Sequence, residues 1–370
     1  MDGRPPTALG LAMSVAMLAC GGEQAGSAPH GDERIEALAL EEIGVVSTMG
    51  AAEGADPRSL LQKPLDAAFV GEHVAILDAS APWIRVFDRR GGLVRAIAGE
   101  GEGPAEALRP YTLSGAANGD LLLTHSLGVT RFDEQGAVVH AMRGGLRARG
   151  AVEACGGQHA VLLVDSELPR SAAVVRFRLN GGELRDTIAV LSPVRSSGRN
   201  YHPWFVEATA DRLLFYSEEE RAGRLLEIAC DGRDMSELPV DSLGRGELIE
   251  GLDSGDGSRR ISVRGPLPPF PAGLATVRGR ILWSARVVEG TDSLTVITAL
   301  EDGGGRRLRI KGWYQLLDAD ETGALLISNT WTLGQNWAYG ASWGLVPAVH
   351  IVDGDALLSA LDEMTPRSAP

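Results

Sequence analysis

The sequence predicts an all-β protein, a six-bladed β-propeller of four-stranded antiparallel blades whose ring is closed by an N-terminal strand that completes the last blade. One observation is a repeat: Phe87, Phe132 and Phe177 lie 45 residues apart, each in a short apolar strand that leads into a turn. Short strands at a fixed period of this length are typical of radial repeats. The other observation is length, because six repeats of about 45 residues take up roughly 270 of the 370 residues.

The repeating unit is clearest at 83–110. An apolar strand at 84–87 is followed by a turn at 91–92, where a glycine pair can supply the positive φ of a tight hairpin, and by a second strand at 93–97. The Gly-rich stretch 99–104 then favours a loop that crosses to the next sheet. Weaker copies follow at 129–139, 175–184, 226–232, 296–303 and 349–354.

These copies divide the chain into blades and give each blade four expected strands. Many strands, such as 74–77, are apolar on both faces, which is expected if each sheet is packed between two neighbours. The blades are predicted at 66–97, 112–142, 151–191, 205–240, 273–311 and 314–352, and a strand at 38–48 completes the last one.

The N-terminal residues are predicted to be a targeting segment that stays outside the fold. Arg4 precedes an apolar run at 8–19 that is too short to span a bilayer but suits a signal peptide. The run ends in Met-Leu-Ala-Cys, which resembles a bacterial lipobox and implies lipidation of Cys20 and a place in the cell envelope. A plain secretory signal is the alternative. The expected organisation is a signal peptide at 1–19, a flexible tether at 20–36, the propeller at 37–355 and a C-terminal tail at 356–370.

The segment 73–106 carries a family resemblance. Its sequence, HVAILDASAPWIRVFDRRGGLVRAIAGEGEGPAE, resembles the NHL-type repeat and the TolB-like six-bladed propeller domains of bacterial secreted lipoproteins. The shared pattern is a strand that ends in Asp, a strand that ends in Val-Phe-Asp, a Gly turn and a loop with Gly-Pro. The resemblance implies fold and topology, but little about function, because such propellers host binding, scaffolding, lactone hydrolysis and lyase chemistry alike.

Charge and motifs restrict the function classes. The formal net charge is −14 and only Lys63 and Lys311 are lysines, so nucleic acid is not an expected partner and a membrane is expected only through the lipid anchor. We expect a monomer. The chain has no GxSxG, HExxH or P-loop motif, and no catalytic residue is assigned. No cofactor is expected, although 318–323 and 253–257 faintly resemble calcium loops.

The candidate binding residues lie in three long connections at 192–204, 241–272 and 329–347. In a propeller, two kinds of connection leave on the same face: those from an outer strand to the next inner strand, and those from a second strand to a third strand. The three long connections are of these kinds, so we expect all of them on that face. Tryptophan and tyrosine are enriched in recognition surfaces because they combine apolar area with a hydrogen-bonding edge. In the alternative, the third connection folds back over the channel as a plug. The candidates are Tyr201, His202, Trp204, Arg259, Arg260, Asn329, Trp331, Asn336, Trp337, Tyr339 and Trp343.

Two function classes remain open from the sequence. The first is a binding or scaffold module for a protein, glycan or small ligand. The second is a metal-dependent hydrolase or lyase similar to the propeller lactonases. Such an enzyme needs metal ligands that face into the channel. The residues of this kind on the predicted inner strands are Asp66, Glu153, Glu207, Gln315 and Asp318. Cys155 and Cys230 fall in neighbouring predicted sheets, and their pairing is left open because an inner strand and a third strand are usually too far apart.

Overall fold

The structure is a computed structural model, and the described part of the chain begins at Ala37 and ends at Glu363. Within the described residues, no helix is long and apolar enough to cross a membrane. The described ranges are 37–50, 57–116, 118–143, 147–154, 158–164, 172–177, 184–191, 206–208, 211–219, 222–238, 247–254, 258–264, 270–289, 292–300, 306–328 and 347–363.

The described residues form six four-stranded antiparallel sheets. Three come from the first half of the chain. They are β2 (Pro64–Val70), β3 (His73–Asp78), β4 (Ile84–Asp88) and β5 (Leu93–Ile97); β8 (Pro110–Gly115), β9 (Leu121–His125), β10 (Gly128–Phe132) and β11 (Val138–Arg143); and β12 (Arg147–Ala154), β13 (Gln158–Val164), β14 (Ala172–Phe177) and β15 (Leu184–Leu191).

Three more sheets follow in the second half. They are β16 (Val206–Ala208), β17 (Arg212–Glu219), β18 (Ala222–Ala229) and β19 (Met235–Leu238); β22 (Phe270–Val277), β23 (Arg280–Glu289), β24 (Asp292–Leu300) and β25 (Arg306–Lys311); and β26 (Tyr314–Ala319), β27 (Gly323–Ser328) and β28 (Ala348–Asp353) with β1 (Val45–Met49). Smaller elements are the 3-10 helix η2 (Pro57–Ser59), the parallel pair β6 (Gly99–Glu100) and β7 (Glu106–Ala107), and the hairpin β20 (Glu247–Ser254) and β21 (Ser258–Arg264).

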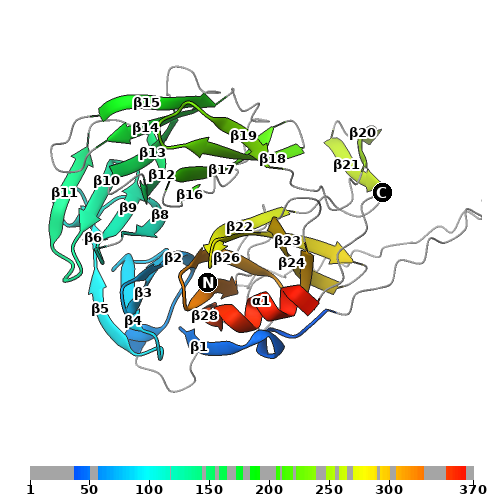
Figure 1. The fold of residues 1–370 in the computed structure, drawn as a ribbon, viewed down its shortest axis with the longest axis horizontal. Helices are drawn as coiled ribbons and strands as arrows, with labels where there is room; N and C mark the ends of the chain where they lie inside the picture. The colour runs from blue at the N-terminus through cyan, green and yellow to red at the C-terminus, as the bar shows by residue number, and fades with distance from the viewer. Residues whose placement is uncertain are drawn as a thin grey trace, which may run out of the picture. The chain divides into compact units, whose positions relative to one another are not determined.

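The sheets are arranged as a β-propeller (Figure 1). The first strand of each sheet lies innermost, and these inner strands contact one another in the cycle β2, β8, β12, β16, β22, β26 and back to β2. We call the end of the sheets at which the inner strands begin the loop face, and the opposite end, where each inner strand turns into the next strand, the hairpin face. This arrangement confirms the all-β propeller of small antiparallel sheets expected from the sequence.

The strands are buried on both faces, as their composition predicts. All five residues of β9 are buried, as are all six of β27. Such strands are expected in sheets that are covered on each side by a neighbour. The Phe repeat also belongs to this core, because Phe87 and Phe132 are fully buried.

Five of the six inner strands share a pairing irregularity. Each pairs with its neighbour in register except at one extra residue near the loop face, which is typical of a β-bulge. The extra residues are Leu65, Tyr111, Arg149, Ala272 and Leu317. Asp66 and Asp318 directly follow the extra residue in their strands. They therefore occupy equivalent positions in two sheets that contact each other.

The N-terminal strand completes the last sheet, because β1 pairs antiparallel with β28. The expected bounds 38–48 are wrong. Leu38 forms an isolated parallel bridge with Ile310 of β25, and a 3-10 helix, η1 (Leu40–Ile43), precedes β1. Gly44 ends η1 with φ +85°, a conformation that glycine adopts readily. The turn of η1 buries Leu40 and Ile43 in the core, which a continuous strand would not do.

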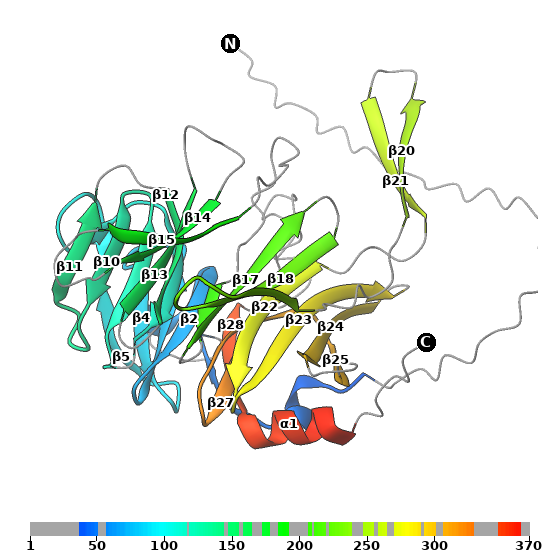
Figure 2. The same cartoon turned by 45° about the horizontal axis from the view of Figure 1, so that its top comes forward.

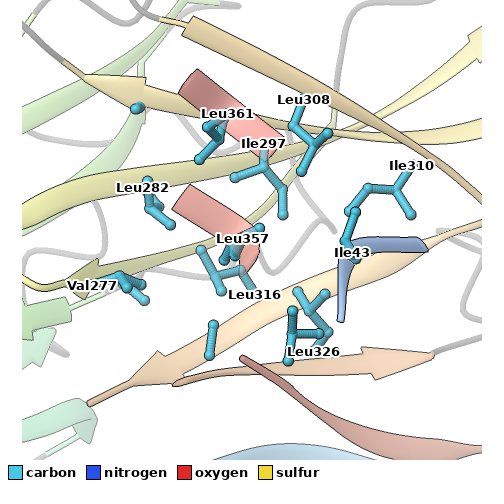
Figure 3. Packing of buried hydrophobic residues seen from close by; sticks show 14 of the residues in the cluster. Ile43, Val277, Leu282, Ile297, Leu308, Ile310, Leu316, Leu326, Leu357 and Leu361 are labelled. Atoms are coloured by element: carbon cyan, nitrogen blue, oxygen red, sulfur yellow. The ribbon is translucent and has the colours of Figure 1, made fainter. Parts of the chain in front are cut away.

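The expected C-terminal tail is helical over much of its length. Helix α1 (Gly354–Glu363) follows β28 directly (Figure 2). Leu357 and Leu361, four residues apart on one helix face, enter the same buried cluster as Leu282, Ile297 and Leu308 of the β22–β25 sheet (Figure 3). The helix therefore covers the seam between the β22–β25 sheet and the sheet completed by β1.

Salt bridges hold α1 to the turn and outer strand of the neighbouring sheet. Arg278 pairs with Asp355, and both Arg280 and Arg306 pair with Asp362 at 2.8 and 2.6 Å. The hydrogen bond from Arg280 lowers the pKa of Asp362 most, and Arg306 adds to that effect. These pairs are solvent-exposed, so the buried leucines supply most of the attachment energy.

Close contact between inner strands predicts one sensitive glycine. A Cβ on Gly273 of β22 would lie 1.6 Å from the carbonyl oxygen of Leu316 in β26. Gly273→Ala should therefore force the two strands apart and lower the free energy of unfolding by about 2–4 kcal/mol, measured by urea denaturation. Gly99→Ala is the control, since its Cβ would meet only the flexible Glu106 side chain at 3.8 Å. Equal midpoints for the two variants would show that the strands are not in close contact.

Candidate functional site in the central channel

The inner strands enclose a cavity of about 300 Å³ at the centre of the ring. All six inner strands contribute to its wall. The lining is mixed: Phe69, Leu113 and Leu274 supply apolar surface, and Asp66 and Asp318 supply carboxylates. The channel is therefore a hollow whose wall combines acidic groups with apolar surface.

Asp66 of β2 connects two neighbouring sheets. Its Oδ2 accepts a hydrogen bond from the backbone N–H of Leu113 in β8 at 2.8 Å, and its Oδ1 accepts one from Ala67 at 2.9 Å. Burial raises the pKa of Asp66 to about 7, although these two hydrogen bonds act to lower it and the charge of Asp318 adds to the rise. Asp66 therefore binds and releases a proton near neutral pH.

Asp318 of β26 makes the equivalent connection at the seam between the last and first sheets. Its Oδ2 accepts from the backbone N–H of Phe69 in β2 at 2.7 Å, and its Oδ1 accepts from Ala319 at 2.8 Å. Burial raises the pKa of Asp318, the two backbone hydrogen bonds oppose the rise, and the charge of Asp320 adds to it. Both channel carboxylates thus bind backbone donors that a neighbouring strand presents.

Hydroxyl groups join two further seams in the same way. Ser114 Oγ of β8 donates to the carbonyl of Ala151 in β12 at 2.5 Å. Ser284 Oγ of β23 accepts from the backbone N–H of Leu316 in β26 at 3.3 Å. Polar side chains near the channel therefore satisfy backbone groups that would otherwise be left unpaired at the contact between inner strands.

Arg89 joins the first and last sheets at the hairpin face. Its guanidinium donates to Asp320 Oδ2 at 2.5 Å, to the Gly71 carbonyl at 2.9 Å and to the Thr322 hydroxyl, and it lies 4.6 Å from the centre of the Phe69 ring. Burial acts to raise the pKa of Asp320, but the hydrogen bonds from Arg89 and Thr322 hold it below the usual value. In the segment 318–323, which resembles a calcium loop, the Asp320 carboxylate thus binds a guanidinium.

The inner-strand residues named as possible metal ligands are only partly brought together. Asp66, Glu153 and Asp318 line the cavity, Gln315 lies on β26, and the side chain of Glu207 is outside the described residues. Across the ranges that the structure describes, no three His, Cys, Asp or Glu side chains form a group that could hold a metal ion.

The predicted binding residues lie almost entirely outside the described part of the chain. Arg259 and Arg260 are on β21, but their side chains are not described. The lipidation site Cys20 also lies outside the described residues. The other candidates outside them are Tyr201, His202, Trp204, Asn329, Trp331, Asn336, Trp337, Tyr339 and Trp343.

The strand order fixes where the three long connections attach. They leave from the ends of β15, β19 and β27 and return at the starts of β16, β22 and β28. Because neighbouring strands within each sheet are antiparallel, all six of these strand ends lie at the loop face. The second connection contains the β20–β21 hairpin.

Cys230, in the turn after β18, is disulfide-bonded. Cys155 lies outside the described residues. The sequence left the pairing of Cys230 open, and the structure shows that this cysteine is not a free thiol.

Of the comparisons with known proteins, the one with solved structures bears on the fold. No protein-family model and no curated protein matches the sequence. Among solved structures, a protein of Bacteroides fragilis NCTC 9343 that is named as an exported protein matches with a TM-score of 0.52 at 10% identity, covering 82% of this chain and 93% of that chain. A β-propeller domain from Myceliophteria thermophila matches with a TM-score of 0.42 at 15% identity, covering 78% and 96%. At 10% identity the likeness to the exported protein shows the fold alone.

The raised pKa of Asp66 predicts a pH dependence of stability. An aspartate in the unfolded chain loses its proton near pH 4, whereas the folded Asp66 keeps its proton up to about pH 7. Between these values the native state binds more protons, so the free energy of unfolding falls as pH rises, by about 2–3 kcal/mol from pH 5 to pH 8.

Urea denaturation at pH 5 and pH 8 checks this expectation. Asp66→Asn should show a smaller loss of stability over that interval than the wild type, because the titrating group is gone. Glu72→Gln, in the exposed turn between β2 and β3, is the matched control and should keep the wild-type slope. An unchanged slope in Asp66→Asn would show that Asp66 does not titrate in this range.

Proposed function

We propose that the chain is a six-bladed, lipid-anchored β-propeller of the cell envelope that acts as a binding or scaffold module through its loop face. The propeller fold and the exported-protein neighbour support this proposal at the level of fold and extracytoplasmic location. The NHL-type and TolB-like repeat, the lipobox at Cys20 and the tether at 20–36 are its sequence support. The partner is a protein, a glycan or a small ligand, and the propeller itself acts as a monomer.

One observation carries the proposal: all three long connections attach at the loop face. These connections contain four of the seven tryptophans, Trp204, Trp331, Trp337 and Trp343. In the described part of the ring, polar side chains such as Asp318 and Ser114 bind backbone groups of neighbouring strands. The sheets therefore form a braced frame, and recognition falls to the connections that the frame displays.

The cysteines and the leader together support an extracytoplasmic compartment. Disulfides persist in oxidising environments such as the bacterial periplasm and are rare in the cytosol. The bonded state of Cys230 therefore supports an extracytoplasmic location. Lipidation of Cys20 would hold the propeller at a membrane surface on a tether of Gly, Ala and Ser, without a spanning segment.

A metal-dependent hydrolase or lyase is the second candidate. The observation that favours it is that Asp66, Glu153 and Asp318 line one cavity. Oxygen ligands of this kind suit calcium or magnesium. Such a site would need further ligands from outside the described residues, so we place this candidate behind the binding module.

Removal of two tryptophans tests the binding proposal. Trp337→Ala combined with Trp343→Ala should weaken binding at least about tenfold, because each ring supplies a large contact area in a recognition surface. Peptidoglycan sacculi and a glycan microarray are the probes, and tryptophan fluorescence titration with each glycan that binds gives the affinity. The melting temperature should stay at the wild-type value.

The control variant is Arg233→Ala, an exposed change in the turn between β18 and β19 at the hairpin face, which should bind like the wild type. Equal affinity of the double tryptophan variant and the wild type would move the site away from this connection. Failure of the wild type to bind any probe would contradict the glycan form of the proposal.

A further inference from the structure

Cys230 has a covalent partner, and the sequence restricts which residue that is. The chain contains three cysteines, Cys20, Cys155 and Cys230. Since Cys230 is disulfide-bonded, its partner is Cys20 or Cys155. Cys20 carries the lipid under the proposed function, so this inference rests on that proposal for the exclusion of Cys20.

Hydrogen bonding places the turn that holds Cys230 beside the residue that leads into the second strand of its own sheet. Cys230 follows the third strand, β18, yet its backbone N–H donates to the carbonyl of Asp211 at 3.0 Å. Asp211 directly precedes β17, where the inner strand turns into the second strand. Cys230 therefore lies beside the start of the second strand, β17, at the end of the turn that leads out of the inner strand.

The neighbouring sheet presents its own inner turn at the same face. Ala154, the last residue of β12, pairs with Gln158, the first residue of β13. Ala154 and Gln158 flank residues 155–157, which include Cys155, and both flanking residues lie at the hairpin face. The inner strands β12 and β16 contact each other, and both turns lie at the hairpin face because the strands of each sheet are antiparallel.

We propose that Cys155 and Cys230 form a disulfide that joins the β12–β15 sheet to the β16–β19 sheet. Side-chain hydrogen bonds already connect four other pairs of neighbouring inner strands or sheets, through Asp66, Ser114, Ser284 and Asp318. The disulfide supplies a covalent connection at a seam where β16 has only three residues. It makes the integrity of this seam dependent on the redox state of the compartment.

The oxidant is the disulfide of an extracytoplasmic thiol–disulfide oxidoreductase. The thiolate of one cysteine attacks that disulfide and forms a mixed disulfide, and the second thiolate then displaces the enzyme. The two cysteines lose two protons and two electrons, and the oxidoreductase leaves as a dithiol. No other co-reactant is required.

Peptide mapping of the full chain, purified from the cell envelope without reductant, is the first part of the test. Free thiols are blocked with iodoacetamide and the protein is digested with trypsin. Tryptic cleavage places Cys155 in peptide 150–170 and Cys230 in peptide 225–233, while Cys20 falls in a third peptide that ends at Arg34. We expect peptides 150–170 and 225–233 to be linked and to separate on reduction. A link from Cys230 to the Cys20 peptide, or alkylation of both Cys155 and Cys230, would overturn the proposal.

Serine variants provide the second part of the test. Cys155→Ser and Cys230→Ser should each leave the other cysteine open to alkylation. Each variant should also melt about 3–6 °C below the wild type, and its melting temperature should no longer change when reductant is added. The double variant should melt like either single variant. If the single variants melt like the wild type, the bond does not hold the seam together.

Cys20→Ser separates this inference from the proposed function. It should release the protein from the membrane fraction and leave peptides 150–170 and 225–233 linked. If the variant stays in the membrane fraction while the link persists, the lipid anchor is wrong and the disulfide stands. If the link is lost in Cys20→Ser, the disulfide proposal fails.

Discussion

The fold depends on the joining of its first and last sheets, because a row of sheets that does not close leaves exposed edges and uncovered apolar faces. An apolar cluster packs the two sheets together, and three hydrogen-bonded contacts add to it. The strand β1 pairs with β28, Asp318 accepts a hydrogen bond from the backbone of Phe69, and Arg89 binds Asp320 across the hairpin face. The closing interactions come from opposite ends of the chain, so the ring forms only when nearly the whole chain is present.

The closure explains what the channel carboxylates do. Each of Asp66 and Asp318 accepts one hydrogen bond from the next inner strand and one from its own strand, so one oxygen of each carboxylate serves the contact between sheets. The arrangement has an electrostatic cost, because two acids are buried in one cavity and the pKa of each is raised. The channel thus braces the ring, and the proposed recognition function is assigned to the long connections that attach at the loop face.

Sequence patterns predicted the propeller and its closing strand but not all of its boundaries. The 45-residue spacing of phenylalanines locates the sheets, and Phe87 and Phe132, the last paired residues of β4 and β10, are both fully buried. The start of the N-terminal strand was wrong because the apolar run at 38–48 suits both a strand and the 3-10 turn that buries Leu40 and Ile43. Helix α1 was missed, although Leu357 and Leu361 have the spacing of an apolar helix face.

The site was less predictable than the fold, for a physical reason. The bond between Arg89 and Asp320 spans 231 residues, and no local pattern encodes such a pairing. Asp66 and Asp318 were recognised as inward-facing acids, but their backbone partners depend on how the inner strands are staggered. The aromatic residues of the loop face were singled out from composition alone, and their arrangement lies outside the described residues.

Native-state hydrogen exchange measured by mass spectrometry tests ring closure most directly. If the N-terminal strand closes the ring, the amides of β1 should exchange as slowly as those of β28 and open only together with them. Fast exchange of β1 while β26, β27 and β28 stay protected would show that residues 45–49 belong to the tether and that the ring is closed in another way.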